Sequence, residues 1–226
     1  SRSRQDGCAP PPVRAGFPLP LVDPDESADI GGGIFTRERP VFRGDLDAPV
    51  MNIQTESDTF SILSSWRVRQ PDTDTFRLWE IAGTAHADRH LLGPAADMID
   101  CTAPINDGPA HLVAKAALRA LDTWVRTGAV PPVAERIPLS DSANNPVPLR
   151  DADGIALGGV RTPPVDVPVD ALSGVPVSSS IICLLLGSTV ALPDTRIAEL
   201  YSSRTEYEQL YEESAVATIA AGFVLE

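Results

Sequence analysis

Residues 50–86, VMNIQTESDTFSILSSWRVRQPDTDTFRLWEIAGTAH, contain two apolar segments that each end in a polar cluster. The first segment, residues 50–55, is short, largely apolar and preceded by a proline, which is typical of a strand. The second, residues 76–83, is rich in aromatic and β-branched side chains and ends in a glycine, which favours a buried strand. The sequence therefore predicts two strands that each lead into a polar loop.

A carboxylate follows the first predicted strand and a histidine follows the second. Asp58 lies in the cluster ESD, and His86 lies in the stretch GTAHADRH. The 28 residues between them (86 − 58) leave room for one crossover between parallel strands. Ligands bind at the carboxyl ends of parallel strands, so we expect both side chains at that edge of the sheet.

An acid and a histidine in this order are two members of a serine-hydrolase triad. A serine hydroxyl is a weak nucleophile at neutral pH, and a histidine activates it by taking its proton. The carboxylate holds the imidazole in the required tautomer and stabilises the imidazolium that forms. In α/β hydrolases the chain order is nucleophile, acid, histidine, and Asp58 and His86 fit the last two places.

Neighbouring side chains are alternatives for these roles. Glu56 lies two residues before Asp58, on the same face if the strand continues, and is an alternative acid. His90 is an alternative histidine, and His86, Asp88 and His90 in HADRH have a spacing that metal ligands also use. Because no further His or Cys cluster supports a metal site, we predict neither a metal nor a cofactor.

The sequence shows no serine in the place that a nucleophile requires. Ser173, Ser178, Ser179 and Ser180 follow the histidine instead of preceding it, and none lies in a G-x-S-x-G elbow. We therefore expect no nucleophile in this chain. The chain also begins without a methionine, and it is interpreted as a fragment whose N-terminal half is missing.

Two stretches have a helical pattern. Over residues 109–127 apolar side chains recur at helical spacing, with a proline at the first position and Gly128 after the last. His111 falls inside this helix and is expected to be a surface or packing residue. Over residues 204–220 a second helix is predicted, because S-R-T-E at 203–206 is a capping-box pattern.

The rest of the chain, with many of its 22 prolines and 16 glycines, favours irregular structure. Residues 1–48 are predicted to be a loop-rich lead-in, and residues 131–180 an extended segment that packs over the surface. We predict one domain over residues 1–226. Residues 49–130 contain its strands, acid, histidine and first helix, and residues 131–226 form a C-terminal extension.

Charge and composition limit the partners of the chain. Its formal net charge of -13 repels the phosphates of nucleic acids and anionic membrane surfaces. The longest apolar run, IICLLL at 181–186, is far too short to span a bilayer. Cys8, Cys101 and Cys183 allow one disulfide with one thiol left over, or three free thiols, so their pairing stays open.

Several longer stretches resemble a bacterial family of α/β-hydrolase-domain proteins, and the resemblance covers most of residues 40–225. The matching stretches are TESDTF (55–60), RQPDTDTFRLWEIAGTAHAD (69–88), PINDGPAHLVAKAALRALDTWVRTGAVPP (104–132), RDADGIALGGVRTPPVDVPVDALSG (150–174) and LYSSRTEYEQLYEESAVATIAAGFVL (200–225). The resemblance implies an α/β fold class with a Ser-His-Asp triad, in which Asp58 is the acid and His86 the histidine.

The resemblance also implies what this chain lacks. It would be the C-terminal half of an α/β-hydrolase fold, with the last parallel strands and their packing helices, and it would be inactive alone. The expected activity of the complete protein is hydrolysis of a small carboxylic ester, or of an amide, by acyl transfer. The missing N-terminal half is then a required partner. The alternative is a non-catalytic binding or assembly module derived from a hydrolase.

Overall fold

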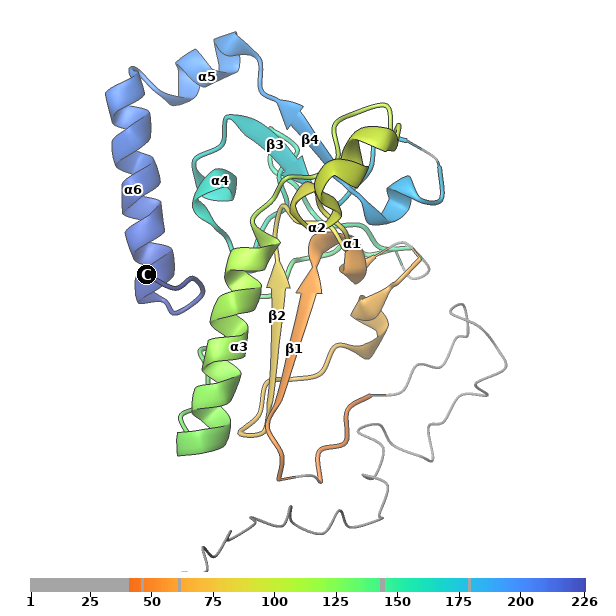
Figure 1. Ribbon diagram of the computed structural model, residues 1–226, viewed down its shortest axis with the longest axis vertical. Coiled ribbons are helices and arrows are strands. Elements are labelled where there is room, and N and C mark those ends of the chain that lie inside the picture. The colour runs from red at the N-terminus through yellow and green to blue at the C-terminus, as the bar shows by residue number, and fades with distance from the viewer. Residues whose placement is uncertain (1–40, 46, 61, 143–144, 179) are drawn as a thin grey trace, which may run out of the picture.

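The computed structural model describes residues 41–226 apart from 46, 61, 143–144 and 179. These residues form a parallel strand pair, an antiparallel strand pair and several helices, which is an α/β architecture (Figure 1). The predictions for Cys8, for Ser179 and for most of the lead-in at 1–48 lie outside the described residues. No helix in the described part is long and apolar enough to cross a membrane.

Strands β1 (Val50–Thr55) and β2 (Phe76–Ile81) form the parallel pair. Their register aligns Thr55 with Ile81, so both strands end at the same level. Every residue of β2 is buried, whereas those of β1 are partly exposed. The difference arises because β2 lies between β1 and a bridge from Val160, while within the described ranges β1 pairs with β2 only.

The connection between the two strands is built from single turns and not from a long crossover helix. It contains α1 (Glu56–Thr59), which begins directly after β1, and a 3₁₀ helix at Ser65–Val68. The strand predicted over residues 50–55 is confirmed. The strand predicted over 76–83 ends earlier, at Ile81, because the chain turns there into the loop that carries the histidine.

Helix α3 (Ala110–Thr127) packs along one face of the strand pair (Figure 1). Its buried stripe combines two alanines with larger side chains, so the helix approaches the strands closely. This core contains Trp79, Ile81, Val113, Ala116, Ala117, Ala134 and Val160. Gly128 ends the helix with a φ of 77°, which residues with a side chain rarely adopt. The helix predicted over 109–127 is confirmed to within one residue.

The segment 131–180 is largely irregular, as predicted, but it also contributes buried side chains to the core, which the prediction of a segment packing over the surface did not include. Much of it is irregular, but it contains α4 (Pro163–Asp166) and β3 (Asp170–Ser173). Its apolar side chains form a second core with Ala82, made of Ile137, Ile155, Ala156, Val165 and Leu172. These side chains occur singly or in short apolar groups such as Ile155–Leu157, separated by prolines, glycines and polar residues, so no periodic pattern signals their burial.

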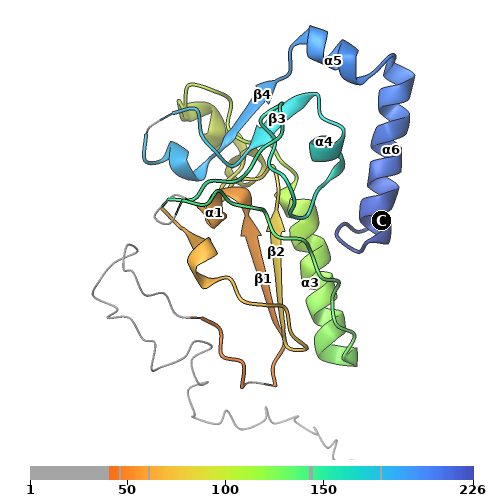
Figure 2. The ribbon, with the colours of Figure 1, turned by 180° about the vertical axis from the view of Figure 1, so that it is seen from behind.

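Strand β3 pairs antiparallel with β4 (Ser188–Ala191), beyond the carboxyl ends of the parallel strands (Figure 2). Then α5 (Asp194–Leu200) leads into α6 (Arg204–Ala220), which packs against α4. The helix predicted over 204–220 is thus confirmed. After α6 the chain returns to the first core, where the ring of Phe223 packs edge-on against Trp79 with 4.9 Å between centroids.

The capping box predicted at the start of α6 forms only in part. The hydroxyl of Ser203 accepts a hydrogen bond from the backbone N–H of Glu206, as the pattern requires. The carboxylate of Glu206 accepts instead from the backbone N–H and the hydroxyl of Ser202, one residue too early for a capping box. Both contacts still occupy donors at the helix start.

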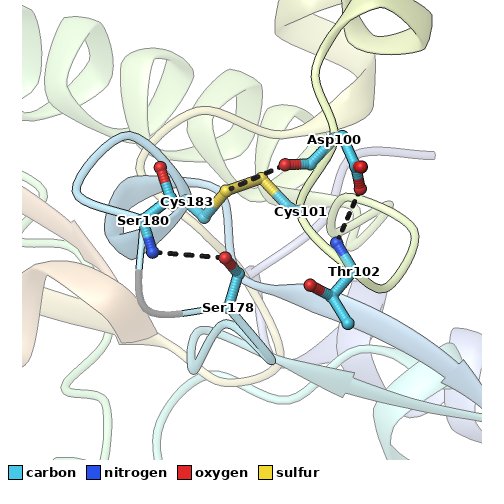
Figure 3. Close-up of a disulfide and its surroundings, with 6 residues drawn as sticks. All are labelled: Asp100, Cys101, Thr102, Ser178, Ser180 and Cys183. Carbon is cyan, nitrogen blue, oxygen red and sulfur yellow. Dashed lines mark hydrogen bonds between the residues drawn. A yellow bond between two sulfur atoms is a disulfide. The ribbon is translucent and has the colours of Figure 1, made fainter.

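A disulfide joins Cys101 to Cys183 (Figure 3). Cys101 follows α2 (Arg89–Leu92) and the 3₁₀ helix Gly93–Met98, and Cys183 opens the short 3₁₀ helix before β4. Both cysteines are buried, in a cluster with Ala96, Ile105 and Leu186. The bond therefore ties the segment that follows His86 to a distant part of the chain.

Removal of this disulfide is expected to lower the free energy of unfolding by about 2–5 kcal/mol. The bond joins residues 82 positions apart, so its loss frees a long loop in the unfolded state. Urea unfolding of the Cys101→Ala/Cys183→Ala variant, with and without reductant, measures the effect. Reductant should bring the native protein to the stability of the variant and leave the variant unchanged. A variant as stable as the oxidised native protein would contradict the expectation.

Candidate active site

The candidate active site lies at the carboxyl ends of β1 and β2. Asp58 belongs to α1, directly after β1, and His86 lies on the loop after β2. The Oδ1 atom of Asp58 and the Nδ1 atom of His86 are 2.7 Å apart. The predicted acid and the predicted histidine therefore form a hydrogen-bonded pair.

Asp58 is held in place by the first turn of α1. Its Oδ2 atom accepts hydrogen bonds from the backbone N–H of Thr55 at 2.7 Å and from the Thr55 hydroxyl at 2.8 Å. These bonds fix the position of the carboxylate and leave Oδ1 to face the histidine. The strand spacing used to find Asp58 does not reveal Thr55, but T-x-x-D is itself a capping pattern.

His86 presents one nitrogen to Asp58 and the other to solvent. Its side chain is 51% exposed, whereas that of Asp58 is only 10% exposed. With a carboxylate at Nδ1, that nitrogen carries the proton, and Nε2 remains the basic nitrogen. The backbone N–H of His86 donates to the hydroxyl of Ser57 at 2.8 Å, which fixes the loop beside the acid.

Glu56, the alternative acid, is engaged elsewhere. Its carboxylate is fully buried and accepts hydrogen bonds from the backbone N–H groups of Gly83 at 2.8 Å and Gly174 at 2.9 Å. It also pairs with the guanidinium of Arg150. β1 ends before this residue and a helical turn begins, so the alternation of strand faces no longer applies. The acid that contacts His86 is Asp58.

The other histidines and Asp88 have partners of their own. The rings of His90 and His111 stack with 3.8 Å between centroids and an interplanar angle of 14°. Asp88 accepts a hydrogen bond from the backbone N–H of Leu91 and so caps α2. Among the residues with described positions, no group of three His, Cys, Asp or Glu side chains could hold a metal ion. His111, expected on the surface or in packing, packs against His90.

The serines after the histidine have local partners. The hydroxyl of Ser173 accepts from the backbone N–H of Val175, and that of Ser178 accepts from the backbone N–H of Ser180. Figure 3 shows Ser178 and Ser180 beside the disulfide. Within the described part of the chain no hydroxyl is hydrogen-bonded to a ring nitrogen of His86.

An apolar pocket of about 200 Å³ opens beside His86. The ends of β1 and β2, the loop after β2 and the first turns of α3 form its walls. Its apolar side chains are Ile53, Ile81, Ala85, Leu91, Ala110 and Ala114. All three histidines of the chain also line it. The exposed imidazole of the pair therefore stands next to an apolar space.

The sequence profile of a protein family described as an alpha/beta hydrolase domain matches residues 6–226. The chain belongs to this family. The resemblance stated from the quoted stretches is thus confirmed, and the membership of the α/β-hydrolase domain supports a hydrolase-type function. No curated protein and no solved structure matches the chain.

The stacked histidines make the stability of this α/β-hydrolase domain sensitive to acid. Burial, and to a smaller extent the charges of His90 and Lys115, lower the pKa of His111, while Asp88 and Asp107 oppose this shift. The unfolded chain keeps the ordinary histidine pKa of about 6.5 and binds more protons than the folded chain below that pH. The free energy of unfolding should therefore fall as the pH drops below about 6.5, through the pKa of folded His111.

The variant His111→Phe tests this expectation. A phenylalanine keeps a ring for stacking but cannot titrate, and the buried Nδ1 atom that it replaces has no hydrogen-bond partner among the residues with described positions. Urea unfolding between pH 5 and pH 8, a range around the histidine pKa of about 6.5, should show a shallower loss of stability in acid for the variant. The stabilities of the native protein and the variant are also compared at pH 8, well above the ordinary histidine pKa of about 6.5, where the acid-dependent loss of stability is absent. Equal slopes would contradict the assignment to His111.

Proposed function

We propose that this α/β-hydrolase domain supplies the acid and the histidine of a serine hydrolase that cleaves small carboxylic esters. The observation that carries the proposal is the 2.7 Å contact between Asp58 Oδ1 and His86 Nδ1, beside a half-exposed imidazole. Both groups follow neighbouring parallel strands, where such folds bind their ligands. Amides react by the same steps and are a second substrate class for the same site.

In the proposed reaction His86 transfers a proton in both stages, the formation of the acyl-enzyme and its hydrolysis. Its Nε2 atom takes the proton of the serine hydroxyl as the serine oxygen attacks the ester carbonyl, and the imidazolium then gives that proton to the leaving alcohol. A water molecule repeats the attack and releases the acid. Asp58 stabilises each imidazolium, and its bonds from Thr55 keep the carboxylate in position.

The serine itself is proposed to come from outside the described residues, in an N-terminal half of the domain. Two observations support this: the hydroxyls of Ser173 and Ser178 have other partners, and β1 pairs only with β2 among the strands of the described ranges. An unpaired strand edge accepts further strands. We therefore propose that residues 1–226 alone are inactive and that a nucleophile-bearing half completes the site.

The same proposal treats residues 49–130 and the extension 131–226 as one domain. Ala134, Val160 and Phe223 from the extension pack into the core formed by β2 and α3. A domain has its own contiguous core, and here that core draws on both parts of the chain.

A fluorophosphonate probe tests the proposed function in the native gene product. The probe reacts with an activated serine, and the intact mass of the protein reports how many probe molecules are bound. One bound probe, with labelling lost in His86→Ala, is the expected result. A native product that stays unlabelled and does not hydrolyse simple esters would overturn the proposal.

A non-catalytic binding or assembly module is the second candidate function. The edge of β1 favours it, because within the described ranges its outer backbone groups pair with no other strand and could bind another chain. In that case the protein would keep the Asp58–His86 pair but have no catalytic serine. Restored turnover after addition of the nucleophile-bearing half, abolished by His86→Ala, favours the enzyme. Stable association without turnover favours the module.

A further inference from the structure

The apolar pocket beside His86 results from the small side chains at the start of α3. Ala110 and Ala114 are four residues apart and lie on one face of the helix, opposite Ile53 and Ile81 of the strands. Larger side chains at the two alanines would fill the space between helix and strands. The pocket therefore exists because Ala110 and Ala114 are small, whereas the following turns of α3 pack tightly against the strands.

The polar groups around the pocket are already engaged with one another. The Thr55 hydroxyl donates to Asp58, and the Asp88 carboxylate caps α2 and is 5% exposed. His90 and His111 stack on each other and form one wall. A charged guest would lose its hydration without gaining a free partner of opposite charge, whereas an apolar guest loses nothing.

We propose that this pocket receives an uncharged apolar substituent of the substrate, next to the bond that is cleaved. The inference rests on the proposed function, because it takes His86 to be the group that serves the scissile bond. A volume of about 200 Å³ is smaller than the usual space for a whole small ligand, about 300–1,000 Å³. The pocket therefore holds one substituent, of the size of a phenyl or short alkyl group, and the ester itself lies outside it toward Nε2.

The proposal is tested by the binding of benzyl alcohol to the native gene product at pH 8, followed by NMR of alanine methyl groups. Saturable shifts are expected at Ala85, Ala110 and Ala114. A second apolar pocket, of about 190 Å³ between α3, α4 and α6, contains Ala215 and gives an internal comparison in the same spectrum. Shifts confined to Ala215 would overturn the proposal.

Two variants and two charged ligands sharpen the test. The variant Ala114→Leu fills the pocket and should weaken binding at least tenfold, whereas Ala217→Leu, an exposed helical alanine in α6, should leave it unchanged. Benzylammonium and benzoate should each bind at least tenfold more weakly than benzyl alcohol. Tighter binding of benzylammonium would overturn the proposal and assign a cation site to Asp88.

The test of the pocket and the test of the proposed function give separate results. Fluorophosphonate labelling of the same sample reports the nucleophile, and the methyl shifts report the pocket. Labelling without benzyl alcohol binding would overturn the pocket and keep the hydrolase. Binding without labelling would keep an apolar ligand site beside His86 and overturn its role as a substrate subsite.

Discussion

The variant His86→Ala is expected to lose ester hydrolysis by about 10⁴–10⁶-fold in the native gene product, the range that follows removal of the histidine from a serine-hydrolase triad. The reason is that no other described group is placed to take a proton at the exposed end of the dyad. The variant Asp58→Asn should cost about 10⁴-fold, although its shape is nearly conserved. An amide facing Nδ1 favours the tautomer whose proton sits on Nε2, and that tautomer cannot act as the base.

Both losses should appear in kcat without loss of the fold. The His86 side chain is 51% exposed, so its removal should change the free energy of unfolding by no more than about 1 kcal/mol. Added imidazole should restore part of the activity of His86→Ala. The exposed Asp74→Asn is a matched control for the aspartate change and should retain full activity. Activity within tenfold of the native value in either variant would exclude the proposed roles.

The variant Glu56→Gln is expected to lower the free energy of unfolding by about 3–5 kcal/mol, the usual cost of breaking a buried ion pair. The carboxylate is fully buried and has three described partners: Gly83, Gly174 and Arg150. A glutamine turns one acceptor into a donor that faces an N–H group or the guanidinium. It also leaves Arg150, whose side chain is 21% exposed, without its counter-charge.

Urea unfolding measures this effect, and Glu199→Gln in α5 is the control. Glu199 makes an ion pair with Arg196, but its side chain is 66% exposed, so its loss should cost at most about 1 kcal/mol. Activity measured where both variants are fully folded separates stability from chemistry. A Glu56→Gln protein that is stable but inactive would show that Glu56, and not Asp58, is the acid.

The sequence was sufficient to predict the Asp58–His86 pair because the positions of both residues depend on local features. Asp58 and His86 each follow a strand, and parallel neighbours bring such positions together. The orientation of Glu56 was not predictable in this way, since it depends on where β1 stops and on Gly174, far along the chain. Strand β4 and the short helices α2 and α5 have too few residues for a periodic pattern to indicate them.

The disulfide and the second core show a different limit. Three cysteines allow several pairings, and only the approach of two loops selects Cys101 and Cys183. The buried side chains of residues 131–180 are held by long-range contacts between irregular segments. Neither hydrophobic spacing nor turn residues carry that information, which is why the contribution of residues 131–180 to the core was not predicted.

The contact between Glu56 and Gly174 has a consequence for the order in which the protein acquires its site. The two residues are 118 positions apart, so their contact forms only after a long stretch of chain has closed on itself. During synthesis, β1, α1 and β2 leave the ribosome well before β3. Asp58 and His86 can form their contact by then. The buried carboxylate of Glu56, however, lacks two of its partners until Arg150 and Gly174 have been synthesised. We therefore expect maturation of the site to be a late event in folding, limited by the arrival of Arg150 and Gly174 and not by the contact between Asp58 and His86.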